Sequence, residues 1–233
     1  MIRITGDTHR DFNRFCEAAM PGESTWTGDD HLIVCGDFGY IMLDNKAEHD
    51  YLDYLETKPY TICFVDGNHE NFPRIYKYPT ERWNGGIIHR IRRNVIHLTR
   101  GQVFTIEGKK IFTMGGAYSI DEGARIPGIT HWEEEIPDKI ELLEAKWNLR
   151  RHKNKVDLMI THTTSLVNIM NMSRLPESNI KAKENAKDRE LVKFLSGLQV
   201  TVDYSHWYFG HFHIDRRITD KCTALMWDVV TVE

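Results

Sequence analysis

Short apolar runs that end in small polar clusters recur along this 233-residue chain, and they constrain its fold more than any other feature. His31 to Cys35 and Tyr60 to Val65 are continuous runs of β-branched and aromatic residues, typical of strands covered on both faces. Ile2 to Thr5 is a shorter run, and Asp44 to Glu56 has a helical pattern. The alternation of strand, helix and strand predicts an α/β fold with a mostly parallel sheet.

The middle of the chain has a different pattern. Between Gly86 and Gly116, strand-like segments alternate with turns of Gly, Asn and Lys. Two of these segments, GQVFTI and KIFTMG, are separated by residues 107–110, which predicts a β-hairpin. Closing strands are expected around Ile218 and from Thr223 to Val230. We therefore expect a second layer of strands that is antiparallel in part.

The second half of the chain adds helices. Pro137 opens a predicted helix in which Ile140, Leu143 and Trp147 recur at helical spacing and form one apolar face. Residues 181–195 are predicted to form a charged surface helix. Residues 156–160 and 206–209 are predicted strands. Because no repeat or Pro-, Gly- or Ser-rich linker divides the chain, we expect one domain over residues 1–233.

Composition is that of an ordinary globular protein, with 41% hydrophobic and 27% charged residues. A formal net charge of -4 gives no global case for nucleic-acid binding, although a local basic groove stays possible. The four cysteines form no C-x-x-C pair, and Cys35 and Cys63 lie within apolar runs. We expect a reducing, cytoplasmic location without disulfides, structural zinc, a secretion signal or a membrane anchor.

Five polar clusters occur in a fixed order, and four of them directly follow an apolar run: Asp7-Thr-His9, Gly36-Asp37, Gly67-Asn68-His69-Glu70, His162 and Gly210-His211-Phe-His213. In an open α/β sheet, ligands gather beyond the carboxyl ends of the strands, so we expect these groups to meet at one rim. Carboxylate, imidazole and amide groups bind hard and borderline divalent metals. The clusters together predict a metal site.

Each cluster alone also has an ordinary structural interpretation. Asp7 and His9 could share one side of an extended loop, or could be an Asp turn followed by a surface His. Asp37 could bridge two cations or cap a turn. Asn68 offers a neutral carbonyl ligand, and His69 beside it would point the other way, toward a substrate.

The histidines at the ends of later strands are of two kinds. A lone His after a strand, such as His162, is usually structural. His211 and His213 share one face at spacing i, i+2, and Gly210 permits close approach of the backbone.

The order D-x-H, G-D, G-N-H-E, H and G-H-x-H resembles that of the calcineurin-like metallophosphoesterases, from Asp7 to His213. The segments GNHENF, WNGG and GGAYSIDEGARIPGITHWEEEIP are similar to a bacterial or phage branch of unassigned substrate. The resemblance implies a four-layer α/β/β/α sandwich of two mixed sheets flanked by helices. It also implies two divalent metal ions, for which the mixed N and O ligands suit Mn, Fe, Zn or Ni.

The resemblance further implies a ligand set. One metal would take Asp7, His9, Asp37 and His213, and the other would take Asp37, Asn68, His162 and His211. Asp37 would bridge the two metals, and His69 would bind no metal and sit beside the scissile phosphate. Two cations about 4 Å apart would acidify a shared water, which attacks the phosphorus of a phosphomonoester or phosphodiester while His69 assists the leaving group.

Other functions stay open. The chain lacks the Asp-Arg that follows the second motif in protein-serine/threonine phosphatases, because residues 36–40 read GDFGY, so phosphoprotein phosphatase activity is not expected. One alternative is a binding scaffold with this fold and no catalysis. Another is a nuclease or nucleotide phosphodiesterase with a nucleotide or nucleic-acid partner. For that alternative a basic patch is available, and its residues could equally be solvated charges: Arg90, Arg92, Arg93 and Arg100.

A long loop from Ala117 to Trp132 precedes the predicted helix, and long loops in compact domains are often functional. Arg125 could pair with a phosphate oxygen, and Trp132 could offer a stacking face. His131 is a further candidate for substrate contact. The alternative is a loop that Tyr118 and Trp132 pack against the core.

Overall fold

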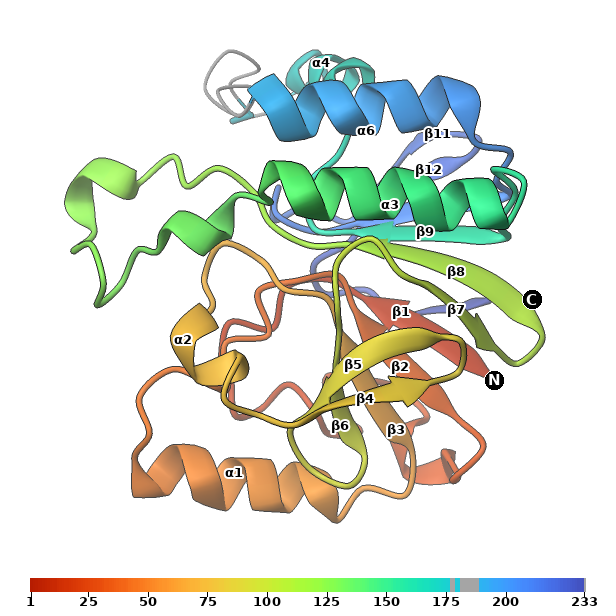
Figure 1. Cartoon of the computed structure of the whole chain (residues 1–233). Coiled ribbons are helices and arrows are strands. Elements are labelled where there is room, and N and C mark those ends of the chain that lie inside the picture. Colours follow the sequence, from red (N-terminus) through yellow and green to blue (C-terminus); the bar gives the residue numbers. More distant parts are fainter. Residues whose placement is uncertain (177–178, 181–188, 233) are drawn as a thin grey trace.

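Two β-sheets pack face to face at the centre of the protein, and helices cover both outer sides (Figure 1). The computed structural model describes residues 1–176, 179–180 and 189–232. The predicted α/β sandwich of two mixed sheets is confirmed.

The larger sheet has seven strands, and the smaller has six. The order in the larger sheet is β13 (Val230–Val232), β1 (Ile2–Thr5), β2 (His31–Val34), β3 (Thr61–Phe64), β6 (Val95–Leu98), β5 (Gly86–Arg90) and β4 (Thr80–Trp83). The order in the smaller sheet is β11 (Arg216–Thr219), β12 (Cys222–Ala224), β10 (His206–Phe209), β9 (Leu158–Thr161), β8 (Lys109–Met114) and β7 (Val103–Ile106).

The helices lie in two outer layers (Figure 1). Those beside the larger sheet are α1 (Lys46–Glu56) and the short α2 (Phe72–Ile75), and those beside the smaller sheet are α3 (Lys139–Arg151), α4 (Leu166–Ser173) and α6 (Arg189–Thr201). In the part of the chain that the structure describes, three short 3-10 turns lie in loops: Glu23–Thr25, Glu122–Ala124 and Glu133–Glu135. No helix in the described ranges has the length and apolar character needed to cross a membrane.

Alternation of apolar side chains along each central strand builds this layering. In β2, Ile33 belongs to the core between the sheets, whereas Leu32 and Val34 belong to the core that contains Leu52 and Leu55 of α1. Strand β10 follows the same rule, because Tyr208 faces the other sheet while its neighbours face α6. Continuous apolar strands are therefore buried on both faces, as the sequence pattern indicates.

Parallel pairing aligns the carboxyl ends of the central strands. Strands β1, β2, β3 and β6 are parallel neighbours in the larger sheet, and β8, β9, β10 and β12 are parallel neighbours in the smaller sheet. The predicted hairpin is confirmed, because β7 and β8 pair antiparallel up to Ile106 and Lys109. The loops that follow the parallel strands carry the polar clusters.

The predicted apolar face of α3 is wrong. Ile140, Leu143 and Trp147 are 73%, 64% and 58% exposed. The buried stripe is instead Leu142, Ala145 and Leu149. Both stripes have helical spacing, so spacing alone does not decide which one is buried. The helix lies so close to Gly101 that a Cβ on Gly101 would be 2.8 Å from the Ala145 Cα. Only small residues fit at this contact, so close packing favours burial of the stripe that contains Ala145.

Two further segments differ from expectation. Strand β4 is not predicted, because its residues Thr80 to Trp83 are mostly exposed and carry no apolar run. The helix predicted over residues 181–195 lies partly outside the described residues. Its described part belongs to α6, where Leu191 and Leu195 are buried in the core against the smaller sheet.

Candidate metal centre

The polar clusters meet where the carboxyl ends of both sheets lie side by side. Asp7, Asp37 and Asn68 follow β1, β2 and β3 of the larger sheet, and His162 and His211 follow β9 and β10 of the smaller one. The predicted rim therefore draws its residues from both sheets.

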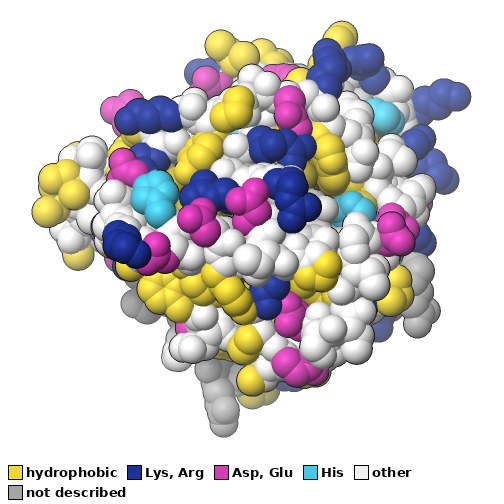
Figure 2. Space-filling view, turned by 90° about the horizontal axis from the view of Figure 1, so that it is seen from below, with side chains coloured by type: hydrophobic (Ala, Val, Ile, Leu, Met, Phe, Trp, Pro, Cys, Tyr) yellow, Lys and Arg dark blue, Asp and Glu magenta, His cyan; other side chains and the backbone are white. Residues whose placement is uncertain are grey.

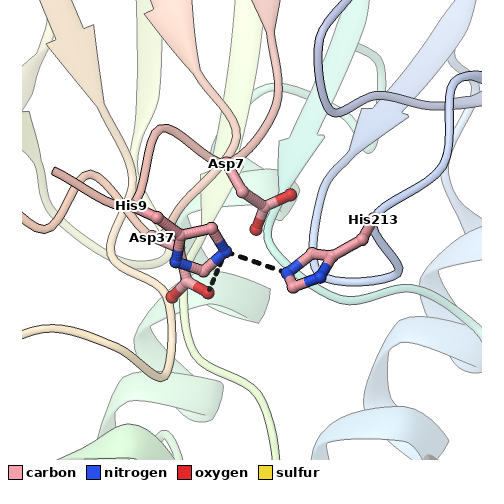
Figure 3. Close-up of side chains that lie close together, drawn as sticks. All are labelled: Asp7, His9, Asp37 and His213. Atoms are coloured by element: carbon pink, nitrogen blue, oxygen red, sulfur yellow. Dashed lines mark hydrogen bonds and ion pairs between the residues drawn. The ribbon is translucent and has the colours of Figure 1, made fainter. Parts of the chain in front are cut away.

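The first group of candidate ligands contains Asp7, His9, Asp37 and His213 (Figure 3). One ligand atom of each residue lies within 4.8 Å of those of the others. The Nε2 atoms of His9 and His213 are 2.9 Å apart, and the His9 Nε2 is 3.7 Å from Asp37 Oδ2. Two carboxylates and two imidazoles directed at one point could hold a divalent cation.

A second group lies on the other side of Asp37. Asn68 Oδ1 is 3.0 Å from His162 Nε2 and 3.0 Å from His211 Nδ1. His162 Nε2 is also 3.4 Å from Asp37 Oδ1. The two carboxylate oxygens of Asp37 thus face imidazoles of different groups, His9 through Oδ2 and His162 through Oδ1.

The tautomer of His162 follows from its surroundings. Its Nδ1 lies 2.8 Å from the Cys35 carbonyl oxygen, which can only accept a hydrogen bond. Nδ1 therefore carries the proton, and the Nε2 lone pair of the neutral ring faces Asn68 Oδ1 and Asp37 Oδ1. A backbone carbonyl that orients an imidazole through its second nitrogen is typical of metal-binding histidines.

Electrostatics favours positive charge at this point. Burial lowers the pKa of His162, but Asp37 and Asp7 outweigh burial, so the pKa of His162 is raised. In the absence of a metal, a proton on His162 Nε2 would supply this positive charge. A divalent cation would supply it too, and would give a partner to His162 Nε2, Asn68 Oδ1 and Asp37 Oδ1 at once. The residues therefore fit a metal.

Burial raises the pKa of Asp7 to about 7, so this carboxyl is the exception; three other candidate ligands are held in metal-binding forms. Burial would raise the pKa of Asp37, but His162, His69 and His9 outweigh it and lower that pKa to about 2. Burial lowers the pKa of His9 to about 4 and the pKa of His211 to about 3. A carboxylate and neutral imidazoles at neutral pH are the protonation states that bind metals.

The backbone is strained in the loops that carry the candidate ligands. Asp37 adopts φ 48° and His213 adopts φ 52°, left-handed values that cost non-glycine residues about 1–3 kcal/mol. Two glycines make room for the ligands: a Cβ on Gly36 would lie 2.1 Å from His162 Nδ1, and one on Gly67 would lie 2.0 Å from Asp37 Oδ1. Such strain persists at functional sites when the surroundings enforce it.

Glu70 is a supporting residue that the sequence reasoning did not assign. Its fully buried carboxylate accepts hydrogen bonds from the backbone N–H groups of Phe38, at 2.7 Å, and Gly39, at 3.2 Å. It thereby holds the loop that carries Asp37. Its place in the G-N-H-E cluster was a signal, but its target lies in another loop and is not visible in the sequence.

His69 lies beside both groups without belonging to either. Its backbone N–H donates to Asp37 Oδ1 at 2.8 Å, and its ring centre is 5.5 Å from that of His9. The ring lines a cavity of about 690 Å³ that also borders Asp37, Asn68 and His211. His69 therefore borders both the candidate ligands and the cavity that they line.

The long loop from Ala117 to Trp132 reaches the same site, and Ile120 and Asp121 line the cavity, but the three side chains considered for substrate contact are engaged with the protein. Arg125 is 7% exposed at its side chain and pairs with Glu135, while its Nη2 donates to the Asn68 carbonyl at 3.0 Å. Trp132 is 6% exposed and buried among the core residues, so it presents no open stacking face. His131 Nε2 lies 3.8 Å from Glu135 Oε2.

The arginines considered for a basic patch are also engaged. Arg90 pairs with Glu81, Arg92 pairs with Asp53 of α1, and Arg93 donates to the Glu56 carbonyl. Arg100 is buried against Asp66. In the view that faces α1 from below, basic and acidic side chains are interspersed rather than gathered by sign (Figure 2).

Comparison with known proteins places the chain in no family. No protein-family model matches it, and no curated protein matches it. The case for a metal centre therefore comes from the geometry of this chain.

Proposed function

We propose that this protein is a metal-dependent phosphoester hydrolase with two divalent cations. The observation that carries the proposal is the position of Asp37 between two sets of ligands. Its Oδ2 is directed to His9 and its Oδ1 to His162, so one carboxylate is available to two cations at once. One carboxylate shared by two cations would keep them close together, as in two-metal sites where the ions lie about 4 Å apart.

The residues divide the chemistry as follows. When bound, the two cations would lower the pKa of a coordinated water and neutralise charge on the phosphate. Asp7, Asp37 and the imidazoles would hold the cations, and Asn68 would contribute a neutral oxygen. His69 faces the cavity and donates a proton to the leaving oxygen, a role worth roughly 10²–10⁴-fold in rate.

The cavity favours a substrate with an uncharged organic group. Beside the candidate ligands, its walls include Ile120, Leu175 and Ile214. Arg216 is the only Lys or Arg among the described residues that line it. A volume of about 690 Å³ exceeds the needs of inorganic phosphate, and apolar walls suit an apolar group on the ester.

The nuclease alternative receives less support. Binding of nucleic acid depends on several unpaired cations along the phosphate backbone. Arg90 and Arg92 are already paired with carboxylates, and Arg100 is buried. A small phosphoester is therefore the better candidate substrate.

A reconstitution assay tests the proposal. Protein stripped of metal and reloaded with Mn²⁺ would be assayed with p-nitrophenyl phosphate, bis(p-nitrophenyl) phosphate, cyclic nucleotides and a short oligonucleotide. We expect metal-dependent hydrolysis of an aryl ester and little hydrolysis of the oligonucleotide. Absence of hydrolysis of every ester by protein that holds two metals would contradict the proposal.

A further inference from the structure

The loop between β8 and α3, at the left of Figure 1, is closed at its base, and its residues Ser119 and Arg125 contact Asn68. The Ala117 N–H donates to the Glu135 carbonyl at 3.0 Å, so the two ends of the loop meet. Gly116 just before it adopts φ 84°, and a Cβ there would lie 2.6 Å from the Glu135 carbonyl oxygen. The loop is therefore a closed unit whose position depends on tight packing at its base.

Hydrogen bonds from this loop determine which way the Asn68 amide points. The Ser119 hydroxyl lies at 2.5 Å from Glu135 Oε2, and a carboxylate can only accept, so Ser119 donates its proton there. Ser119 Oγ then has only acceptor sites left, and Asn68 Nδ2 donates to it at 3.0 Å. The carbonyl oxygen of the amide must consequently face His162 and His211.

Arg125 completes the arrangement. Its Nη1 donates to Ser119 Oγ, its Nη2 lies 2.9 Å from Glu135 Oε1, and the same Nη2 donates to the Asn68 carbonyl at 3.0 Å. Both the backbone and the side chain of Asn68 are thus held by one loop. Every one of these partners is buried or nearly so.

We propose that Ser119, Glu135 and Arg125 are positioning residues that present the Asn68 oxygen to the second metal position, the one formed by Asp37, Asn68, His162 and His211. A reversed amide would direct an NH₂ group at the cation and remove one ligand. The loop thereby sets the affinity of the second metal position. This inference rests on the two-metal centre of the proposed function and is independent of the reaction.

The burial of the Arg125–Glu135 pair agrees with this role. An ion pair inside a protein adds little stability compared with apolar side chains of the same size, because both charges lose their hydration. The Arg125–Glu135 pair instead orients its neighbours. The carboxylate fixes the direction of the Ser119 hydroxyl proton, and the guanidinium fixes the Asn68 backbone. Groups behind metal ligands commonly act in this way.

Calorimetric titration of metal-free protein with Mn²⁺ tests the inference. Asn68→Ala identifies the binding step that depends on Asn68. Ser119→Ala and Glu135→Gln are then compared with Glu134→Gln, a matched control because Glu134 is the exposed neighbour of Glu135. We expect Ser119→Ala and Glu135→Gln to weaken that step by about 10–100-fold and to leave the other step unchanged, and we expect Glu134→Gln to match the wild type.

Several results would overturn the inference. Both steps unchanged in Ser119→Ala and Glu135→Gln, or both weakened equally in variants with native circular dichroism, would mean that the loop does not orient Asn68. Fewer than two bound Mn²⁺ in the wild type would also overturn it. If the wild type binds two Mn²⁺ and the variants behave as expected while no phosphoester is hydrolysed, only the proposed function fails. Ser119→Ala removes a single oxygen atom, so it keeps the test valid if Glu135→Gln folds poorly.

Discussion

Asp37 is the residue on which both halves of the candidate centre depend, because its two oxygens face different imidazoles. We expect Asp37→Asn to lose both metals, since an amide supplies one oxygen and no charge. Metal content per folded chain, measured by plasma emission spectrometry, should fall from two to below one. Asp50→Asn is the charge-matched control, because Asp50 lies on the exposed surface of α1 and pairs with Lys46. Two metals retained in Asp37→Asn would rule out the bridging role.

Substitution of the single residue His69 should separate the effect on catalysis from the effect on metal binding. Its contact with Asp37 is made by the backbone N–H, which alanine keeps. We therefore expect His69→Ala to retain both metals and to lose roughly 10²-fold or more in kcat on an aryl phosphate. Loss of a metal in this variant would make His69 a ligand instead.

At the scale of the element, α3 offers a matched pair of leucines. Leu149 is 1% exposed in the core against the smaller sheet, whereas Leu143 is 64% exposed. We expect Leu149→Ala to lower the free energy of unfolding by about 2–5 kcal/mol, because it leaves a cavity. Leu143→Ala should change it by less than about 0.5 kcal/mol. Urea denaturation of both variants provides the measurement, and equal losses would mean that the helix packs through its other face.

At the scale of the whole molecule, the buried Asp66 contacts elements of both sheets. Its carboxylate pairs with Arg100 at 2.6 Å and with His97 of β6 at 3.1 Å, and its carbonyl accepts from Gly116 beyond β8. Burial favours the neutral acid, but Arg100 and His97 outweigh it and hold the pKa of Asp66 below its usual range.

Acid should therefore weaken the fold through this residue. A lowered pKa in the folded state means that the contribution of Asp66 is fully present above its unfolded pKa of about 4 and is lost as the pH falls through the folded pKa. We expect Asp66→Asn to cost at most about 3–5 kcal/mol at pH 7, because the buried Arg100 loses its closest charged partner and keeps only Glu141. Urea denaturation at several pH values measures the free energy of unfolding of both proteins. The difference between Asp66→Asn and the wild type should narrow below about pH 4. If the difference in free energy of unfolding does not change with pH, Asp66 acts through packing alone.

Local patterns in the sequence determined the strands and the identity of the candidate ligands. Continuous apolar runs predict buried strands, and Asp37, Asn68 and His162 follow such runs directly or after a short turn. These features depend on neighbours in the chain, so they can be read without the fold. Parallel strands also end at one edge, which made their convergence predictable in outline.

Only the tertiary structure decided the distances between these groups and the contacts that hold them. Two stripes of α3 have the same spacing, and the space beside Gly101 selected Ala145 and Leu149 for burial. Arg125 was one candidate for substrate contact, and in the structure its guanidinium is held by Glu135 and by the backbone of Asn68. These contacts join residues far apart in the chain, and their free energy depends on burial and on the direction of donors and acceptors. Neither quantity leaves a periodic trace in the sequence.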